Sequence, residues 1–208
     1  MPTRSGQAQS QTSSPYSLHP GFAREAAVIA KFKEKTGKTF QQWVELAKKS
    51  GPPGAGAKRD WLKTEHGLTT NYAMFVAETA EGRGGSANYH PDDLVNQIFA
   101  GPKEHLRPLY EEVLNFGLAL GKDVKVCPCA TIIPFYRKHV FAQVKVPNRS
   151  RIDLGFAFGD LKAEGKLIDT GGFAKKDRIT HRIELSSAAE FDSGAQALMR
   201  RAYEMDGN

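Results

Sequence analysis

The first part of the chain, up to about residue 80, has apolar residues at the spacing of α-helices. Phe40, Trp43, Val44 and Ala47 form an i, i+3, i+4, i+7 stripe. Thr39 precedes this stripe with a glutamine three residues later, which is the pattern of a capping box. Other apolar groups predict three more helices, one from Phe22 to Gly37, one around Trp61 that ends at Gly67, and one after Thr69. Together they predict a small helical bundle.

A Gly-rich stretch at residues 82–90 separates this bundle from a second pattern. Apolar faces predict two helices, from Pro91 to Gly101 and from Leu106 to Gly121. After Gly121 the spacing of the apolar residues falls from about 3.6 toward two. This spacing predicts strands at roughly 123–127, 130–136, 139–146 and 151–158. After a polar connection at 159–176, a last strand from Asp177 alternates through Ile179, His181, Ile183 and Leu185, and a C-terminal helix carries Ala195, Leu198, Met199, Ala202 and Tyr203.

These patterns predict an α+β protein, in which a helical bundle precedes a domain with an antiparallel sheet flanked by helices. The connection at 159–176 is expected to be long and mobile, because it is polar and rich in glycine. The expected boundaries are a disordered tail at 1–21, a helical domain at 22–81, a linker at 82–90 and an α+β domain at 91–206.

Composition supports folding of most of the chain, with hydrophobic residues at 40% and charged residues at 25%. The tail is the exception, because its Ser, Gln, Thr and Pro residues bury too little apolar surface to offset the entropy of ordering. It lacks the apolar core of a signal peptide, and no run of about 18 apolar residues predicts a membrane span. Two cysteines do not make a disulfide framework. We therefore expect a cytoplasmic protein with no membrane partner.

The net charge of +6 arises mostly in residues 1–90, which carry 12 Lys and Arg against 7 Asp and Glu. Such an excess is compatible with ordinary solubility or with contact to nucleic acid or another polyanion. The helix, glycine turn and helix around Gly67 have the outline of a helix-turn-helix, although bundle packing produces the same outline. The candidate anion contacts, expected at solvated positions, are Lys48, Lys49, Lys58, Arg59 and Lys63.

A second polar set is expected on one face of the predicted sheet. In the strand at 151–158, Arg151 and Asp153 alternate with apolar residues and should point away from the core. Such a face can bind a phosphate, a single strand or another small anion, or it can be a solvated surface with a cross-strand ion pair. The full set of expected sheet-face residues is Gln143, Lys145, Arg149, Arg151 and Asp153.

The pair Cys127 and Cys129 has one residue between the thiols, whereas zinc sites and thioredoxin-like thiols usually have two. We expect no metal here, and His139 and His181 are the residues that would complete the alternative four-ligand site. His181 lies on the apolar side of its strand, which favours a buried neutral imidazole over a catalytic base acting with Arg151 and Asp153. No Gly-rich phosphate loop, His-Glu-x-x-His pattern or nucleophile elbow occurs, so no catalytic residue or cofactor is assigned.

Several short motifs resemble known families. The segment from Thr36 to Ala80, with Trp61-Leu62-Lys63 and His66-Gly67-Leu68, resembles a helical bacterial domain of unknown function. A second set resembles an uncharacterised domain that also ends larger proteins labelled predicted transport or restriction-endonuclease-like. Its motifs are Arg151-Ile152-Asp153-Leu154-Gly155, Arg178-Ile179-Thr180-His181 and Arg201-Ala202-Tyr203.

These resemblances cover residues 22–206 and imply a protein of two modules, but they imply no activity. We therefore expect a non-catalytic binding or accessory protein for nucleic acid or another anionic partner. The alternative is an uncharacterised enzyme, or a protein that binds a small anionic ligand on the sheet face of its C-terminal domain.

Overall fold

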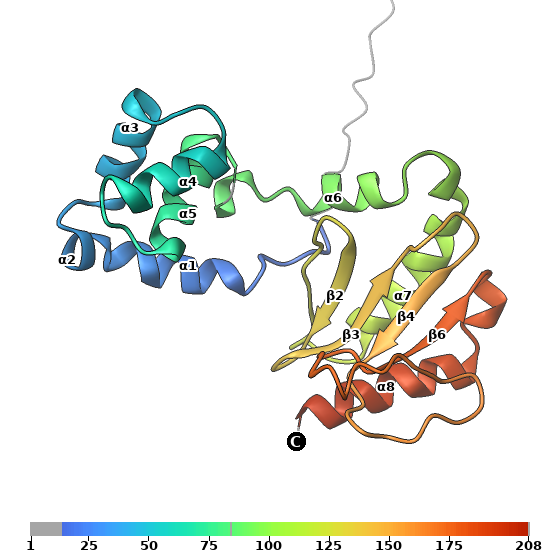
Figure 1. Cartoon of the computed structure of the whole chain (residues 1–208). Helices are drawn as coiled ribbons and strands as arrows, with labels where there is room; N and C mark the ends of the chain where they lie inside the picture. The colour runs from blue at the N-terminus through green and yellow to red at the C-terminus, as the bar shows by residue number, and fades with distance from the viewer. Residues whose placement is uncertain (1–13, 84, 208) are drawn as a thin grey trace, which may run out of the picture. The chain divides into compact units, whose positions relative to one another are not determined.

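The computed structural model of the protein describes residues 14–83 and 85–207. They form two compact units, which we call the helical domain, Leu18–His90, and the sheet domain, Pro91–Gly207 together with residues 14–17 (Figure 1). Within these residues, no helix has the length and apolar character needed to cross a membrane. The α+β fold class is confirmed, since the described residues of the first unit form helices without strands and those of the second form a sheet with helices.

The helical domain contains the predicted helices, with one difference. The capping box is confirmed, since the backbone N–H of Gln42 donates to Thr39 Oγ1 at 3.2 Å and the N–H of Thr39 donates to Gln42 Oε1 at 2.9 Å. The first predicted helix is two helices that meet at Lys31 and end at the left-handed Gly37, with φ of 78°. The helices are α1 (Gly21–Ala30), α2 (Phe32–Thr36), α3 (Phe40–Ser50), α4 (Ala55–Thr64) and α5 (Thr70–Ala80).

One apolar cluster holds the helical domain together. Phe32 is fully buried and packs edge-on against Phe40 and Tyr72. Trp43 is buried as well, and its indole N–H donates to Thr36 Oγ1 at 2.8 Å, so that its polar edge has a partner. The buried members of the cluster are Phe32, Trp43, Val44, Ala47, Leu62, Leu68, Ala73, Val76 and Ala77.

The sheet domain is built on a six-stranded antiparallel sheet in the order β1-β2-β3-β4-β6-β5. Each predicted strand region contains a strand, although every strand is shorter than its predicted run. The additional edge strand β5 lies within the connection that we expected to be mobile throughout, and it pairs with the start of β6. The strands are β1 (Lys125–Val126), β2 (Ile132–Tyr136), β3 (Val140–Lys145), β4 (Ile152–Phe156), β5 (Ile168–Asp169) and β6 (His181–Leu185).

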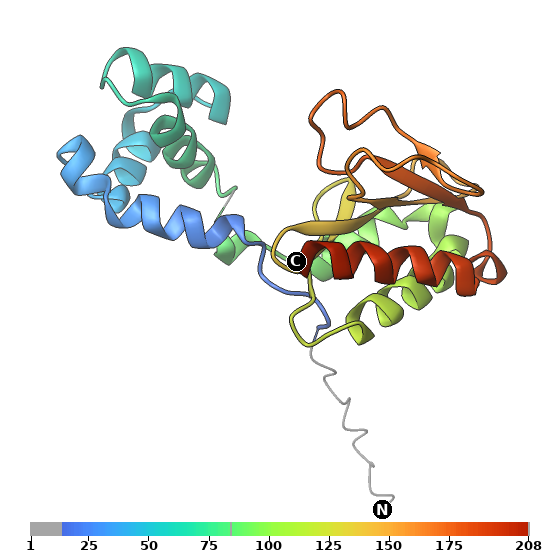
Figure 2. The same cartoon turned by 90° about the horizontal axis from the view of Figure 1, so that it is seen from below.

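Helices cover one face of this sheet. The two longest, α7 and α8, run along the same side of the strands (Figures 1 and 2). Gly117 of α7 allows a close approach, because a Cβ atom there would lie 2.5 Å from Phe135 Cε1 and 2.8 Å from Met199 Cε. The helical segments of the domain are α6 (Pro91–Ile98), η2 (Gly101–Leu106), α7 (Arg107–Ala119), η3 (Ala188–Glu190) and α8 (Ser193–Gly207).

The end of the expected disordered tail belongs to the sheet domain. The Tyr110 hydroxyl donates to the Tyr16 hydroxyl at 3.0 Å, and the N–H of Ser17 donates to the Val126 carbonyl at 2.8 Å. The structure differs here from our expectation because one aromatic ring and one backbone hydrogen bond hold a segment whose average composition is polar. Residues 18–21 of the expected tail belong to the helical domain, where Gly21 begins α1, and residues 1–13 lie outside the described residues.

The last strand starts at His181, not at Asp177. His181, Ile183 and Leu185 are buried on the helix-covered face, as their alternation predicts. The same alternation predicts that Ile179 also lies on the helix-covered face, and this prediction is wrong. Ile179 Cγ2 lies 2.6 Å from the position that a Cβ of Gly155 would take, on the opposite face of the sheet. The chain turns just before the strand, and this turn brings residues 177–179 over the sheet.

Candidate functional site

The sheet face opposite α7 and α8, which we call the open face, carries two rows of polar residues. Strand register aligns Gln143 of β3, Gly155 of β4 and Arg182 of β6 in the first row. The second row has Lys145, Asp153 and Glu184 on the same three strands. Because side chains two residues apart on a strand share a face, both rows point away from the helices.

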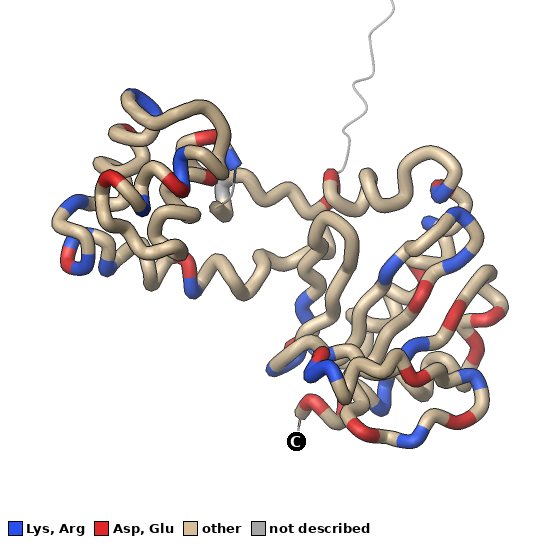
Figure 3. Tube along the Cα trace, viewed as in Figure 1, with Lys and Arg blue, Asp and Glu red and all other residues tan. Residues whose placement is uncertain are grey.

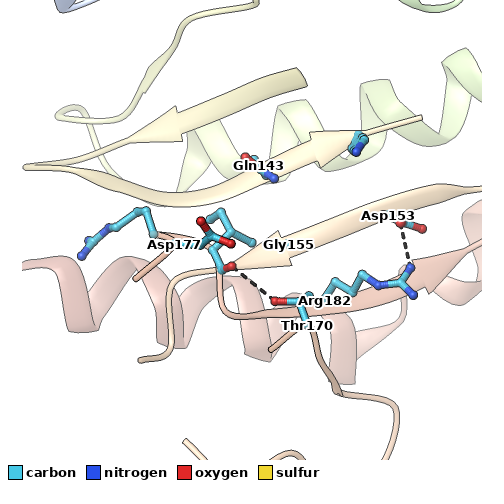
Figure 4. A pocket seen from close by; sticks show the side chains of 9 residues that line it. Gln143, Asp153, Gly155, Thr170, Asp177 and Arg182 are labelled. Atoms are coloured by element: carbon cyan, nitrogen blue, oxygen red, sulfur yellow. Dashed lines mark hydrogen bonds and ion pairs between the residues drawn. The ribbon is translucent and has the colours of Figure 1, made fainter. Parts of the chain in front are cut away.

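A cavity of about 490 Å³ lies over these rows. The segment after β5 supplies its rim, and the sheet supplies its floor, as Figure 4 shows for Gly155, Thr170 and Asp177. Its size is within the range of small-molecule binding sites. The residues that line it are Gln143, Lys145, Asp153, Gly155, Thr170, Asp177, Arg178, Ile179 and Arg182.

Gly155 forms the floor because it has no side chain. An added Cβ would lie 2.6 Å from Ile179 Cγ2 and 3.4 Å from Gln143 Cγ. Any larger residue would therefore occupy the space between the sheet and the rim. The absence of a side chain at this one position lets Ile179 approach β4.

Four charged side chains form a closed network at one end of the cavity. Arg151 Nε donates to Asp153 Oδ1 at 2.9 Å, and its Nη1 lies 3.0 Å from Glu184 Oε2. Arg182 Nη1 lies 2.7 Å from both Asp153 Oδ2 and Glu184 Oε1. Two guanidinium groups thus balance two carboxylates, and the Asp153 carboxylate, whose side chain is 14% exposed, has a cation on each oxygen.

Three polar groups of the cavity have no such partner. Within the part of the chain that the structure describes, no ion pair or side-chain hydrogen bond involves Lys145, Gln143 or the Asp177 carboxylate. Lys145 stands beside Asp153 in the strand register, but Asp153 is already held by the two arginines. These three groups are therefore free to contact a ligand.

Arg178, by contrast, is committed to the protein. Its Nε donates to the Val140 carbonyl at 2.7 Å, and its Nη2 donates to Asp206 Oδ1 near the end of α8. Asp206 is buried and also accepts from the backbone N–H of His139 at 2.8 Å. Arg178 therefore joins the rim of the cavity to β3 and α8, and it has little freedom to bind a ligand.

Hydrogen bonds to backbone carbonyl groups hold the rim in place. The Thr170 hydroxyl donates to the Thr180 carbonyl at 2.9 Å, and the N–H of Asp177 donates to the Gly172 carbonyl at 2.8 Å. Gly172 is needed for this packing, because a Cβ there would lie 2.5 Å from the Ile179 carbonyl oxygen. The side chains of the rim are thus carried by an anchored turn.

The structure brings together part of the predicted sheet-face set. Gln143, Lys145 and Asp153 line the cavity, and Arg151 contacts Asp153 beside it. Arg149 lies in the turn before β4 and does not line the cavity.

Sequence reasoning missed the other polar residues of the cavity. Arg182 had a usable signal, because it alternates with His181 and Ile183 and so must face outward. Thr170 and Asp177 had none, because the turn that places them over the sheet has no periodic pattern. Gly155 was within a recognised motif, but its role depends on the contact with Ile179.

The predicted basic set of the helical domain does not consist of free cations alone. Figure 3 shows acidic residues (red) interspersed with basic residues (blue) along this domain. Lys48, Lys49 and Lys63 are exposed and have no ion pair within the described residues. The expected solvated position of Lys58 is wrong. Its side chain is 8% exposed, and its Nζ donates to Glu81 Oε1 at 2.6 Å and to the Pro52 carbonyl at 2.8 Å.

Arg59 is paired too, since its Nη2 lies 2.8 Å from the neighbouring Asp60 carboxylate. The periodicity around Trp61 could not reveal the position of Lys58, because the acidic partner, Glu81, comes from the end of α5.

The cysteine pair lies close to β1, away from other metal-ligand side chains. Over residues 14–83 and 85–207, no three His, Cys, Asp or Glu residues are grouped so as to hold a metal ion. Burial, together with the neighbouring Cys129 thiol, raises the pKa of Cys127 to about 11, which keeps it a thiol at neutral pH. His139 contacts Asp206 through Nδ1 at 3.2 Å, and His181 Nδ1 lies 2.9 Å from Thr180 Oγ1. Neither histidine is a neighbour that would complete a metal site.

Comparison with known proteins agrees with the two-module interpretation. Residues 25–82 match the family model of a domain of unknown function (DUF4287), and residues 95–206 match that of another (DUF5655). The curated proteins and the solved structures gave no match. The two resemblances found in the sequence are thus confirmed as two domains of unknown function. Since the second match covers more than half of its residues, the chain belongs to the family named domain of unknown function (DUF5655).

Proposed function

We propose that the protein is a binding module whose sheet domain holds a small anionic ligand in the cavity on the open face. The observation that carries this proposal is Lys145, an ammonium group that lines the cavity and has no ion-pair partner among the described residues. The neighbouring Gln143 amide offers N–H donors that have no competing partner among the described residues.

The charge network beside Lys145 supports anion binding. Asp153 would repel an anion if its carboxylate were free, but Arg151 and Arg182 each contact one of its oxygens. The network of two arginines and two carboxylates is neutral overall, so Lys145 remains the uncompensated charge at that end. A carboxylate or phosphate there can form a charge-assisted hydrogen bond with the ammonium group.

The arrangement favours binding over catalysis by the residues that the sequence suggested. His181 lies on the helix-covered face, where it is 1% exposed. Arg151 and Asp153 lie on the open face. A general base must come within hydrogen-bond reach of its substrate, and the sheet separates His181 from the cavity.

An NMR titration tests the proposal. The full chain, labelled with ¹⁵N, is titrated with pentanoate and separately with inorganic phosphate. We expect the largest shift changes at the amides of Gln143, Lys145 and Gly155, and a loss of affinity of about tenfold in Lys145→Met, because the charge-assisted contact is removed.

Lys122→Met is the matched control, since Lys122 is exposed, lies in the same domain and has no contact with the cavity. The proposal is wrong if neither anion shifts these amides, or if the two lysine variants lose affinity equally.

A second candidate function is contact of the helical domain with nucleic acid. The exposed lysines at the ends of α3 and α4, Lys48, Lys49 and Lys63, favour it, since none has an acidic partner within the described residues. The same lysines also complement the negative ends of their helix dipoles, which is a purely structural role. A binding measurement at different salt concentrations distinguishes nucleic-acid contact from this structural role.

A further inference from the structure

The cavity on the open face carries a free negative group as well as a free positive one. Asp177 lines the same cavity as Lys145, and in the described part of the chain its carboxylate has no ion pair or hydrogen bond. Exposed carboxylates are ordinarily just solvated. Here, however, the carboxylate is on the wall of a cavity whose other acidic lining residue, Asp153, is neutralised.

The two free charges lie at different ends of the cavity. Lys145 is opposite Asp153 in the strand register, which places it in the second polar row. Figure 4 shows Asp177 near Gly155 of the first row and apart from Asp153. Because a strand rises about 3.3 Å per residue, rows two residues apart are separated by about 7 Å. One small molecule can therefore reach both groups.

The backbone of Asp177 is also held in position. Its N–H donates to the Gly172 carbonyl at 2.8 Å. The next residue, Arg178, is fixed by its bonds to Val140 and Asp206. A carboxylate on a fixed backbone contributes more to binding than one on a mobile loop, because less loop entropy is lost on contact.

Building on the proposed anion site, we infer that the ligand is a small zwitterion. Its carboxylate or phosphate binds Lys145 of the second row, and its protonated amine binds Asp177 near the first row. A linker of about four to six bonds spans the distance between the two rows. A dianion would place a negative charge against Asp177, so the same geometry selects against dicarboxylates.

Three matched probes test this inference by NMR titration of the full chain: 5-aminopentanoate, pentanoate and glutarate. We expect 5-aminopentanoate to bind about fivefold more tightly than pentanoate, the upper end of what a solvent-accessible ion pair contributes. Glutarate should bind more weakly than 5-aminopentanoate. In Asp177→Asn, the affinities for pentanoate and 5-aminopentanoate should become similar.

Asp160→Asn is the control, because Asp160 is exposed in the same domain and does not line the cavity. Asp177→Glu provides a second variant that keeps the charge, and the amide spectrum of each variant reports whether it is folded. The inference is overturned if the amine gives no gain, or if the gain persists in Asp177→Asn. Those results would leave the anion site standing, whereas failure of all three probes would remove both proposals.

Discussion

Gly155 shows how one residue shapes the open face. It lies inside β4, between Asp153 and the end of the strand, where other residues place a side chain over the sheet. Glycine is ordinarily unfavourable within a strand, because it loses the most backbone entropy and packs no side chain. At this position it creates the space that Ile179 and the cavity occupy.

Replacing Gly155 tests this role. Gly155→Ala should lower the stability of the sheet domain by about 1–3 kcal/mol, because the new methyl group overlaps Ile179 and must displace it. Gly56→Ala is the control, since a Cβ at that position in α4 meets nothing within 4 Å. Urea denaturation of the two variants measures the difference. Equal stability of both variants would contradict the proposed contact.

Lys58 offers a second test at the residue scale. In Lys58→Met the apolar stem remains but the Pro52 carbonyl loses its donor inside the fold. The helical domain should lose about 1–3 kcal/mol, the cost of an unsatisfied buried polar group. Hydrogen exchange of the α4 and α5 amides measures it. Lys63→Met, on the exposed side of the same helix, should change exchange little.

The partner of Lys58 predicts a dependence on pH. The hydrogen bond from Lys58 holds the pKa of Glu81 below its ordinary value. The folded state therefore binds this proton less readily than the unfolded state does. The resulting stability is present above the ordinary pKa of glutamate, about 4.3, and is lost as the pH falls through the lowered folded value. The free energy of unfolding of Lys58→Met, measured over this pH range, should fall less steeply with decreasing pH than that of the unsubstituted protein.

Sequence reasoning worked best at residues whose neighbours are close in the chain. The Thr39 capping box and the burial of His181 follow from local spacing and are confirmed. Lys58 and Gly155 were not predictable in the same way, because their partners Glu81 and Ile179 come from other segments. Local spacing predicts that a charged residue next to an apolar stripe is solvated, because the spacing does not reveal an acidic partner from another segment.

At the scale of elements, the end of α8 is held to two other parts of the sheet domain. The Asp206 carboxylate accepts from the N–H of His139 before β3 and from Arg178 before β6. Lys138 Nζ adds a bond of 2.6 Å to the Gly207 carbonyl. The last turn of α8 thus fixes the segment that carries the rim of the cavity.

Loss of this connection should be visible in dynamics. We expect Asp206→Asn to cost about 1.5–3 kcal/mol, the range for hydrogen bonds to charged groups. Faster hydrogen exchange is expected at His139 and in residues 177–180. Glu204→Gln, an exposed neighbour on α8, should leave exchange at these sites unchanged. Unchanged exchange in Asp206→Asn would exclude a holding role for the carboxylate.

The elements themselves followed from periodicity, but the arrangement at the sheet edge did not. β5 has only two residues, both exposed, so no alternation marks it. The turn over Gly155 likewise depends on the contacts of Thr170 and Gly172 with the chain before β6. Polar, Gly-rich composition suggested mobility there, whereas backbone hydrogen bonds give the segment a defined path.

At the scale of the whole molecule, the nucleic-acid candidate is tested by salt. If the helical domain binds DNA or RNA through phosphates, affinity should fall steeply with salt and vary little with sequence. Replacing Lys48, Lys49 and Lys63 by Ala should reduce the salt slope by up to about three phosphate contacts. A titration of fluorescent single- and double-stranded oligonucleotides at low salt measures it.

A matched triple variant of the sheet domain, Lys122, Lys162 and Lys175 to Ala, controls for net charge, since all three lysines are exposed. An equal change of slope in both variants would indicate a general charge effect. If no oligonucleotide binds at low salt, the helical domain does not contact nucleic acid and this second candidate function is wrong.

The predicted linker at 82–90 has its own test. Limited proteolysis should cut within this stretch, because it is rich in glycine and its described residues contain no regular element beyond the three-residue 3₁₀ helix Ser86–Asn88. The two products should stay associated under native conditions, since Tyr16 and Ser17 remain bonded to Tyr110 and Val126 of the other fragment. Size-exclusion chromatography after cleavage measures this. Immediate separation would show that these contacts are too weak to hold.

The Tyr16–Tyr110 contact also sets an order for synthesis. Its two residues are 94 positions apart, and the whole helical domain is translated between them. On the ribosome, Tyr16 emerges first but has no docking site until Tyr110 and β1 have been made. The helical domain can fold during that interval, and its compaction shortens the effective loop that the contact must close. Variants that unfold the helical domain should therefore delay docking of Tyr16 while changing the final equilibrium only slightly, because loop-closure entropy grows slowly with length.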